Sequence, residues 1–319
     1  MNKERLAAWG PWLVLFAAML WATDAPFRVH LTQELSSGFI VFAEHFVDVL
    51  IAIPILLWNW ANLKELTRRD WIAVLAIAIG GSALASVAFT QAFHYVNPSV
   101  AILLQKVQPL IAITLAGLFL GETLRRNFWL WAAVALFGAY LISFPQLTPQ
   151  LYEGEAFNPN TIGVLLALTA AILWGGSTVL GRYVLQRAAF QTLTALRFTI
   201  AFLFLGFLNL YQGTFPALSS VTATDWLFIA VIALTSGVFS LFLYYYGLQY
   251  TKASIATIAE LGFPLAAVLV NAYFIAGVMQ PGTQLGLFLG QWVGTLLLLC
   301  ALYMLSRVNR EETPQEIKV

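Results

Sequence analysis

Seven ionisable residues lie inside long apolar stretches of the sequence, where each could bind a ligand or carry a proton. They are Asp24, Glu44, His45, Asp48, Lys106, Arg197 and Glu260. At the centre of a membrane helix, a charged side chain costs about 2.5–3.5 kcal/mol on insertion scales. Their summed cost would be on the order of 15–25 kcal/mol, above the usual protein stability of about 5–15 kcal/mol. We therefore expect these residues to face a cavity or one another rather than lipid.

Depth along the predicted helices pairs four of these residues. Glu44 and Lys106 lie about 12–13 Å from one membrane face, and Arg197 and Glu260 lie equally far from the other. Two ion pairs are therefore predicted, Glu44 with Lys106 and Glu260 with Arg197. These pairs could simply hold helices together, or they could be shared with a zwitterionic substrate. In the second case a lysine or arginine would bind its carboxylate, and an acidic side chain its ammonium group.

Asp24 and Arg28 form a third candidate pair, because they lie four residues apart across Pro26. Proline interrupts helical hydrogen bonding and could open the outer end of the first helix. The two charges fit either a pair at the membrane surface or the wall of a cavity, so Asp24 is a candidate substrate-binding residue.

Glu44 and Asp48 share one helix face, with His45 beside them. Neighbouring carboxylates favour the binding of a proton by one of them, because like charges repel. Glu44, His45 and Asp48 are therefore candidates for carrying a coupling proton.

Aromatic residues give a second signal, with 11 Trp, 11 Tyr and 24 Phe in the chain. Trp21 and Trp174 lie deep in predicted helices rather than at their ends, where interfacial anchoring would explain them. Tyr244–Tyr246 point in three directions around a helix, so at least one faces inward, and we select Tyr245 as the candidate. An aromatic cavity with fixed charges suits an amphipathic metabolite, although core packing also explains such rings.

Pro109 and Pro264 lie inside predicted helices, where proline frees a carbonyl group and bends the helix. They are predicted hinges, with a static kink as the alternative.

The composition excludes a water-soluble domain. Hydrophobic residues make up 60% of the 319 residues and charged residues 10%, and the mean hydropathy is +0.81, whereas soluble domains are about a quarter charged. With 16 Lys and Arg against 15 Asp and Glu, there is no excess charge to attract nucleic acid. The single cysteine, Cys300, excludes an intrachain disulfide and multi-cysteine metal sites. The chain is predicted to be a multi-pass membrane protein.

Ten stretches are long and apolar enough to span a bilayer as helices, since a span needs roughly 20 residues. They lie near residues 12–30, 36–58, 71–95, 97–120, 127–144, 161–182, 189–211, 225–250, 253–277 and 282–305. The predicted fold class is therefore an all-α integral membrane protein with ten transmembrane helices.

Thirteen of the 16 Lys and Arg residues lie at one face of this ten-helix arrangement. Cationic loops stay on the cytoplasmic side of membranes. Residues 1–11 and 307–319 are therefore predicted to be cytoplasmic tails.

The two halves of the chain repeat one pattern. Asp70-Trp71 recurs as Asp225-Trp226, and the same spacing of 155 residues pairs Pro109 with Pro264. Each half holds five helices, an odd number, so the second copy enters the membrane from the opposite side. Two inverted five-helix repeats are predicted, over residues 12–145 and 160–306, with a site between them near the middle of the membrane.

This pattern resembles the drug/metabolite transporter superfamily, EamA-type branch, over residues 12–305. The resemblance is carried by the order of Leu104–Pro109–Leu110, Gly121-Glu122-Thr123-Leu124 and Ala195-Leu196-Arg197-Phe198. It implies a cytoplasmic-membrane permease for small metabolites, often an exporter, including exporters of amino acids. The second half departs from the pattern, because Ala276-Gly277 replaces the expected Gly-Glu. That departure favours a structural role for Glu122.

The predicted function is a secondary transporter that exports a small amphipathic metabolite, with an amino acid favoured, by alternating access in a bacterial-type inner membrane. Alternatives are a carrier of sugars, nucleotide sugars or cationic drugs, and a membrane protein that does not transport. The sequence has no metal-ligand spacing, nucleotide-binding loop or nucleophile motif, so neither an enzyme nor a bound cofactor is predicted. The expected partners are a metabolite, a coupling proton and membrane lipid. The fifth and tenth helices have few polar residues, which fits helix packing or contact within a homodimer.

Overall fold

The computed structural model describes residues 3–96, 101, 104–105, 107–124, 126–143, 161–270 and 289–316. These residues form helices joined by short connections, and no strand occurs among them. Lys106 lies outside the described residues, so the Glu44–Lys106 ion pair stays a prediction.

The first half of the chain contains nine helices among the described residues. They are α1 (Lys3–Trp21), α2 (Ala25–Leu31), α3 (Ser37–Trp58), the 3-10 helix η1 (Trp60–Glu65), α4 (Arg68–Leu75), the π-helix η2 (Ala76–Leu84), α5 (Ala85–Ala92), α7 (Gln108–Leu120) and α8 (Arg126–Ser143), the last of which closes the half. Helices α4, η2 and α5 are continuous and form one long rod.

The second half repeats this order. It contains α9 (Thr161–Val184), α10 (Phe190–Gln212), the 3-10 helix η3 (Leu218–Ser220), α11 (Ala223–Ile232), the π-helix η4 (Ala233–Phe239), α12 (Ser240–Leu248), α13 (Ala253–Ala259), α14 (Gly262–Val270) and α15 (Leu289–Glu316). The π-helical segments η2 and η4 interrupt equivalent rods in the two halves.

Six helical segments among the described residues are long and apolar enough to cross a membrane. They are Leu6–Leu31, Ser37–Trp58, Arg68–Ala92, Ile162–Val184, Phe190–Gln212 and Ala223–Leu248. Shorter apolar helices cover Gln108–Leu120, Ala253–Ala267 and Trp292–Arg307. Together with α8, these segments place a helix, or part of one, in each of the ten predicted spans. The chain is an all-helical, multi-pass membrane protein, as the sequence predicts.

Matching side chains begin the third helical rod of each half. Thr67 accepts a hydrogen bond from the backbone N–H of Asp70, and the Asp70 carboxylate accepts from the Thr67 N–H in return. Thr222 and Asp225 form the same reciprocal cap on α11. Such a cap satisfies backbone donors that a helix start leaves free. The recurrence of Asp-Trp in the sequence therefore marks the same structural position in both halves.

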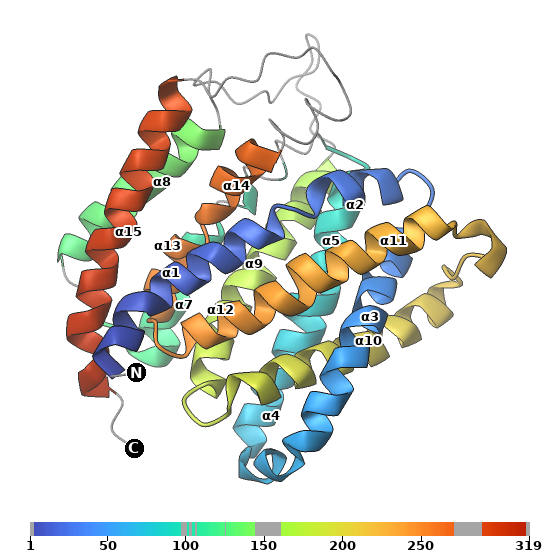
Figure 1. The fold of residues 1–319 in the computed structure, drawn as a ribbon, viewed down its shortest axis with the longest axis horizontal. Coiled ribbons are helices and arrows are strands. Elements are labelled where there is room, and N and C mark those ends of the chain that lie inside the picture. The colour runs from blue at the N-terminus through green and yellow to red at the C-terminus, as the bar shows by residue number, and fades with distance from the viewer. Residues whose placement is uncertain are drawn as a thin grey trace.

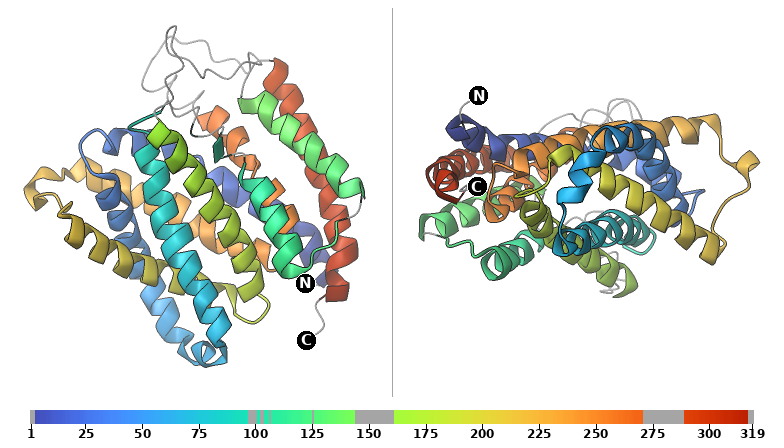
Figure 2. Two further views of the ribbon diagram at one scale, coloured as in Figure 1. Left: turned by 180° about the vertical axis from the view of Figure 1, so that it is seen from behind. Right: turned by 90° about the horizontal axis from the view of Figure 1, so that it is seen from below.

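The halves are inverted with respect to each other. Helix α1 runs away from the end where both chain termini lie, whereas its counterpart α9 runs toward that end (Figure 1). The α3–α4 and α9–α10 connections also lie toward that end, and the views in Figures 1 and 2 agree. Helices α8 and α15 pack side by side at one edge of the molecule (Figure 2). No described residue of either helix lines the cavity, and the pair packs against α1 and α14, which fits the predicted packing role.

Three predicted spans are broken rather than continuous. The first breaks between α1 and α2 at residues 22–24, and the ninth breaks between α13 and α14 at Glu260-Leu261. In the fourth, α7 starts at Gln108 with Pro109 in its first turn. Within a membrane, such irregular backbone is tolerated where it is buried in protein or lines a water-filled cavity. Pro109 and Pro264 both follow a break, which agrees with the bends predicted there, while motion about them stays a prediction.

Candidate functional site

A cavity lies between the two halves, and broken helices supply part of its wall. Its lining includes Asp24, which lies at the α1–α2 break, and Glu260, which lies at the α13–α14 break. The rest of the wall comes from both halves, with apolar and polar side chains of α2, α3, η2, α5, α7, α9, α10, α11, η4, α12, α13 and α14. The predicted site residues that line it are Trp21, Asp24, Glu44, His45, Asp48, Pro109, Trp174, Arg197 and Glu260.

Arg28 forms the centre of one charged cluster in this cavity. Its guanidinium nitrogens lie 2.9 Å from Asp24 Oδ2 and 2.9 Å from Glu44 Oε1. It also donates a hydrogen bond to Thr90 Oγ1, at 3.1 Å. The Asp24–Arg28 pair predicted from the sequence is therefore confirmed, but it is buried and shared with Glu44 rather than exposed at the surface.

Arg197 forms a second cluster whose partners are all neutral. Its Nε donates to Ser82 Oγ, and its Nη1 donates to the Tyr245 hydroxyl at 2.8 Å. Its Nη2 lies 3.4 Å from the carbonyl oxygen of Gly81. Among the described residues no carboxylate lies within ion-pair distance of Arg197, so its positive charge remains available to a ligand.

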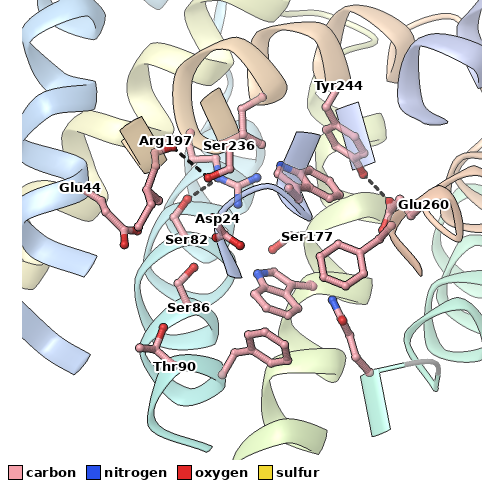
Figure 3. A pocket seen from close by; sticks show the side chains of 18 of the residues that line it. Asp24, Glu44, Ser82, Ser86, Thr90, Ser177, Arg197, Ser236, Tyr244 and Glu260 are labelled. Carbon is pink, nitrogen blue, oxygen red and sulfur yellow. Dashed lines mark hydrogen bonds between the residues drawn. The ribbon is translucent and has the colours of Figure 1, made fainter. Parts of the chain in front are cut away.

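Glu260 accepts hydrogen bonds from three neutral donors instead of pairing with Arg197. Tyr244 OH donates at 2.8 Å, Thr178 Oγ1 at 3.1 Å and Gln108 Nε2 at 2.5 Å. The predicted Arg197–Glu260 ion pair is therefore wrong, because equal depth along two helices does not bring side chains to the same side of a cavity. Figure 3 shows Arg197 and Ser82 on one side and Tyr244 and Glu260 on the other.

Tyr244, rather than Tyr245, lines the cavity. Its hydroxyl bridges Thr178 Oγ1 at 2.9 Å and Glu260. Tyr245 is fully buried behind Arg197 and accepts its hydrogen bond there. The sequence identified the correct run of tyrosines but selected the wrong ring, since one helical residue rotates a side chain by about 100°.

Two aromatic pairs face the cavity, and each contains one ring from each half. The centroids of Trp21 and Tyr244 lie 5.2 Å apart, and those of Phe89 and Trp174 lie 5.1 Å apart. The spacing of 155 residues that relates the halves also relates Phe89 to Tyr244. Trp21 and Trp174 end the matching stretches Ala-Ala-Met-Leu-Trp and Ala-Ala-Ile-Leu-Trp of the two halves, so the two pairs are equivalent. The cavity is thus bounded by two similar aromatic walls.

Close backbone contact brings the two halves together behind these walls. Trp174 Nε1 donates to the carbonyl oxygen of Gly81 at 2.9 Å. A side chain at Gly81 would collide with Ser177 on α9, so glycine permits the helices to approach. The Gly80-Gly81 pair therefore serves helix packing next to the cavity.

Several polar lining residues escaped the sequence analysis: Arg28 as a shared ion partner, and Ser82, Thr90, Gln105, Gln108 and Thr178. Serine, threonine and glutamine cost less free energy in a membrane helix than charged residues, so hydropathy gives no signal for them. The repeat spacing does give a signal for Gln105, because it lies 155 residues before Glu260.

Comparison with known proteins identifies the family. The model of the EamA-like transporter family matches the chain twice, at residues 8–144 and 161–307. The chain belongs to this family, so the class of protein that the fold and cavity define is a membrane transporter.

Individual relatives are of similar length. The chain is 31% identical over 307 residues to the riboflavin transporter ImpX of Fusobacterium nucleatum, covering 94% of this chain and 98% of that one. It is 24% identical to the uncharacterized inner membrane transporter YicL of Salmonella typhimurium, covering 93% and 95%. A crystal structure with 13% identity superposes with a TM-score of 0.70, covering 94% of this chain and 97% of the other, which supports the fold alone.

Proposed function

We propose that the protein is a secondary transporter for a flat aromatic metabolite, and that its substrate is riboflavin. The observation that carries this proposal is the arrangement of Trp21–Tyr244 and Phe89–Trp174 as equivalent aromatic walls of one cavity. Aromatic surfaces of this kind stack on planar ring systems. The name of the relative ImpX supports the same substrate class.

The charges along the cavity favour a neutral ligand over an anionic one. Among the described lining residues, four carboxylates face two guanidinium groups: Asp24, Glu44, Asp48 and Glu260 against Arg28 and Arg197. Arg28 is already neutralised by two carboxylates. A phosphorylated metabolite would therefore meet more negative than positive charge, whereas riboflavin carries none at neutral pH.

The transport cycle in this proposal is alternating access in a bacterial inner membrane, with both termini in the cytoplasm. The two inverted halves would rock around the cavity, as inverted-repeat transporters do. Because every aromatic wall contains one ring from each half, such a movement would separate the rings of both pairs and release the substrate.

An amino acid is the second candidate substrate, since one observation favours it. Arg197 and Asp48 both line the cavity, and neither has an ion partner among the described residues. A zwitterion could place its carboxylate on the first and its ammonium group on the second. Export of an aromatic amino acid is the form of this alternative that uses the same cavity.

Flux through proteoliposomes containing the purified protein distinguishes these candidates. We expect saturable riboflavin flux that excess tryptophan or phenylalanine leaves unchanged. Trp174→Ala should reduce the flux, while Trp129→Ala, which removes an exposed ring on α8 away from the cavity, should not. Flux of an aromatic amino acid without riboflavin flux would overturn the riboflavin proposal in favour of the second candidate.

A further inference from the structure

Several polar atoms of the cavity wall lack a hydrogen-bond partner within the described part of the chain. They include His45 Nε2, Asp48 Oδ1 and Gln105 Oε1, all of which are buried. A buried polar atom without a partner costs free energy, so native proteins seldom leave one unsatisfied. These atoms indicate that a bound ligand supplies the missing hydrogen bonds.

The chemistry of His45 can be assigned from its other ring nitrogen. Its Nδ1 lies 2.9 Å from the carbonyl oxygen of Val41, one turn earlier in α3. A carbonyl oxygen only accepts, so Nδ1 carries the hydrogen atom. The neutral ring then presents Nε2 to the cavity as an acceptor.

Asp48 presents a second acceptor on the same helix. It is 2% exposed, and no donor or cation contacts Oδ1 among the described residues. Gly237 of η4 lies against it so closely that an added Cβ would be 2.6 Å from Oδ1. The glycine leaves room for the carboxylate at the cavity wall, where any larger residue would displace it.

On the opposite side of the cavity, the Glu260 carboxylate is satisfied, although the buried hydroxyl of Thr257 on α13 lacks a partner among the described residues. Glu260 already receives three hydrogen bonds, from Tyr244, Thr178 and Gln108. In Figure 3 Glu44, Ser82 and Arg197 lie on one side, whereas Tyr244 and Glu260 lie on the other. Since Asp48 and His45 follow Glu44 on α3, these two unsatisfied acceptors belong to a different wall from Glu260.

We propose that Asp48 and His45 form a hydroxyl-binding subsite that holds the polyhydroxylated tail of the substrate. This inference rests on the proposed function and adds the orientation of the bound substrate in the cavity. The aromatic pairs hold the ring, and hydroxyl groups of the tail donate to Asp48 Oδ1 and His45 Nε2. A phosphate at the end of this tail would lie beside Asp48 and be disfavoured.

Three flavins with closely related tricyclic rings test the subsite: riboflavin, its 5′-phosphate, and lumichrome, the alloxazine that lacks the tail. Binding is measured on purified protein through quenching of ligand fluorescence. We expect the wild type to bind riboflavin at least tenfold more tightly than the other two. Asp48→Leu should weaken riboflavin binding about tenfold to hundredfold and leave lumichrome binding within twofold, since hydrogen bonds to charged groups are the stronger ones.

Matched variants separate recognition from folding. Asp48→Asn keeps the size of the side chain and one acceptor, so we expect an intermediate loss of the preference for riboflavin. His45→Phe should also reduce that preference. Thr192→Val is the control, because Thr192 has a buried hydroxyl without a partner but does not line the cavity.

The outcomes distinguish this inference from the proposed function. Equal weakening of riboflavin and lumichrome by Asp48→Asn would overturn the subsite while leaving flavin transport intact. Unchanged selectivity with an altered pH dependence of flux would also overturn it, and would assign Asp48 to a coupling proton instead. If the wild type bound none of the three flavins, the proposed function would fail and the subsite with it.

Discussion

The two buried arginines of the cavity differ in how their charge is balanced. Arg28 lies between Asp24 and Glu44, with 2.9 Å to each carboxylate. Within the described part of the chain, the hydrogen bonds of Arg197 go only to the hydroxyls of Ser82 and Tyr245 and to a backbone carbonyl. A buried ion pair has little charge left to offer, whereas a cation held by neutral groups can still bind a ligand. Residues of the same type, lining the same cavity, are thus expected to differ in role: Arg28 holds the structure and Arg197 serves the ligand.

Replacing Arg28 should have the largest effect on folding. Arg28→Met leaves Asp24 and Glu44 buried without their cation, so we expect a loss of about 3–5 kcal/mol of stability. Thermal unfolding in detergent measures this loss. The triple variant Asp24→Asn, Arg28→Met, Glu44→Gln should recover much of the stability. If Arg28→Met unfolded at the wild-type temperature, the proposed difference between the two arginines would be wrong.

Replacing Arg197 should act mainly on binding. In Arg197→Met the neutral partners can pair with water or with each other, so we expect a stability loss of about 1 kcal/mol. Loss of charged hydrogen bonds to the substrate, each worth about 1.5–3 kcal/mol, should weaken riboflavin binding about tenfold to hundredfold. Fluorescence titration and melting of the same sample check both values. If Arg197→Met melted at as low a temperature as Arg28→Met and showed no separate loss of riboflavin binding, both arginines would be structural.

The two aromatic walls allow a more sensitive comparison. Because Trp21 and Trp174 are related by the repeat, Trp21→Ala and Trp174→Ala should weaken riboflavin binding to a similar extent. Aromatic pairs contribute about 0.5–1.5 kcal/mol beyond buried area, so we expect about threefold to tenfold for each. Phenylalanine at either position should retain most of the affinity. A defect confined to one wall would indicate that the substrate contacts one half only.

A smaller effect on stability is expected at Glu122, where the sequences of the two repeats differ. Glu122 accepts hydrogen bonds from the backbone N–H groups of Ala253 at 2.7 Å and Ser254 at 3.1 Å, and so caps the start of α13. Glu122→Gln should cost about 1 kcal/mol of stability, as other lost helix caps do. Riboflavin affinity should change less than twofold, because Glu122 does not line the cavity. Melting and titration of this variant together test the structural role predicted for it.

The sequence predicted the membrane fold because hydropathy, helix length and repeat spacing are properties of the chain alone. It also predicted that Trp21, Trp174 and Arg197 belong to one region, since burial of a charge or of a repeated tryptophan needs an explanation. The structure places all three at the cavity.

Partners within that region could not be predicted, because they depend on helix rotation and on contacts between the halves. Depth alone matched Arg197 with Glu260, yet the first contacts Tyr245 and the second Tyr244. Gln105 was missed since an amide in a helix carries little hydropathic signal. The repeat spacing of 155 residues relates Gln105 to Glu260, but the sequence does not show that both residues line one cavity. The structure shows this directly.

A structure determined with riboflavin bound tests the central claim most directly, namely that the cavity between the halves holds a flat substrate between its two aromatic walls. We predict the flavin ring between the Trp21–Tyr244 and Phe89–Trp174 pairs, with Arg197 contacting the ligand and Arg28 still bound to Asp24 and Glu44. A flavin located outside this cavity, or one contacting Arg28 while Arg197 keeps its neutral partners alone, would contradict the account.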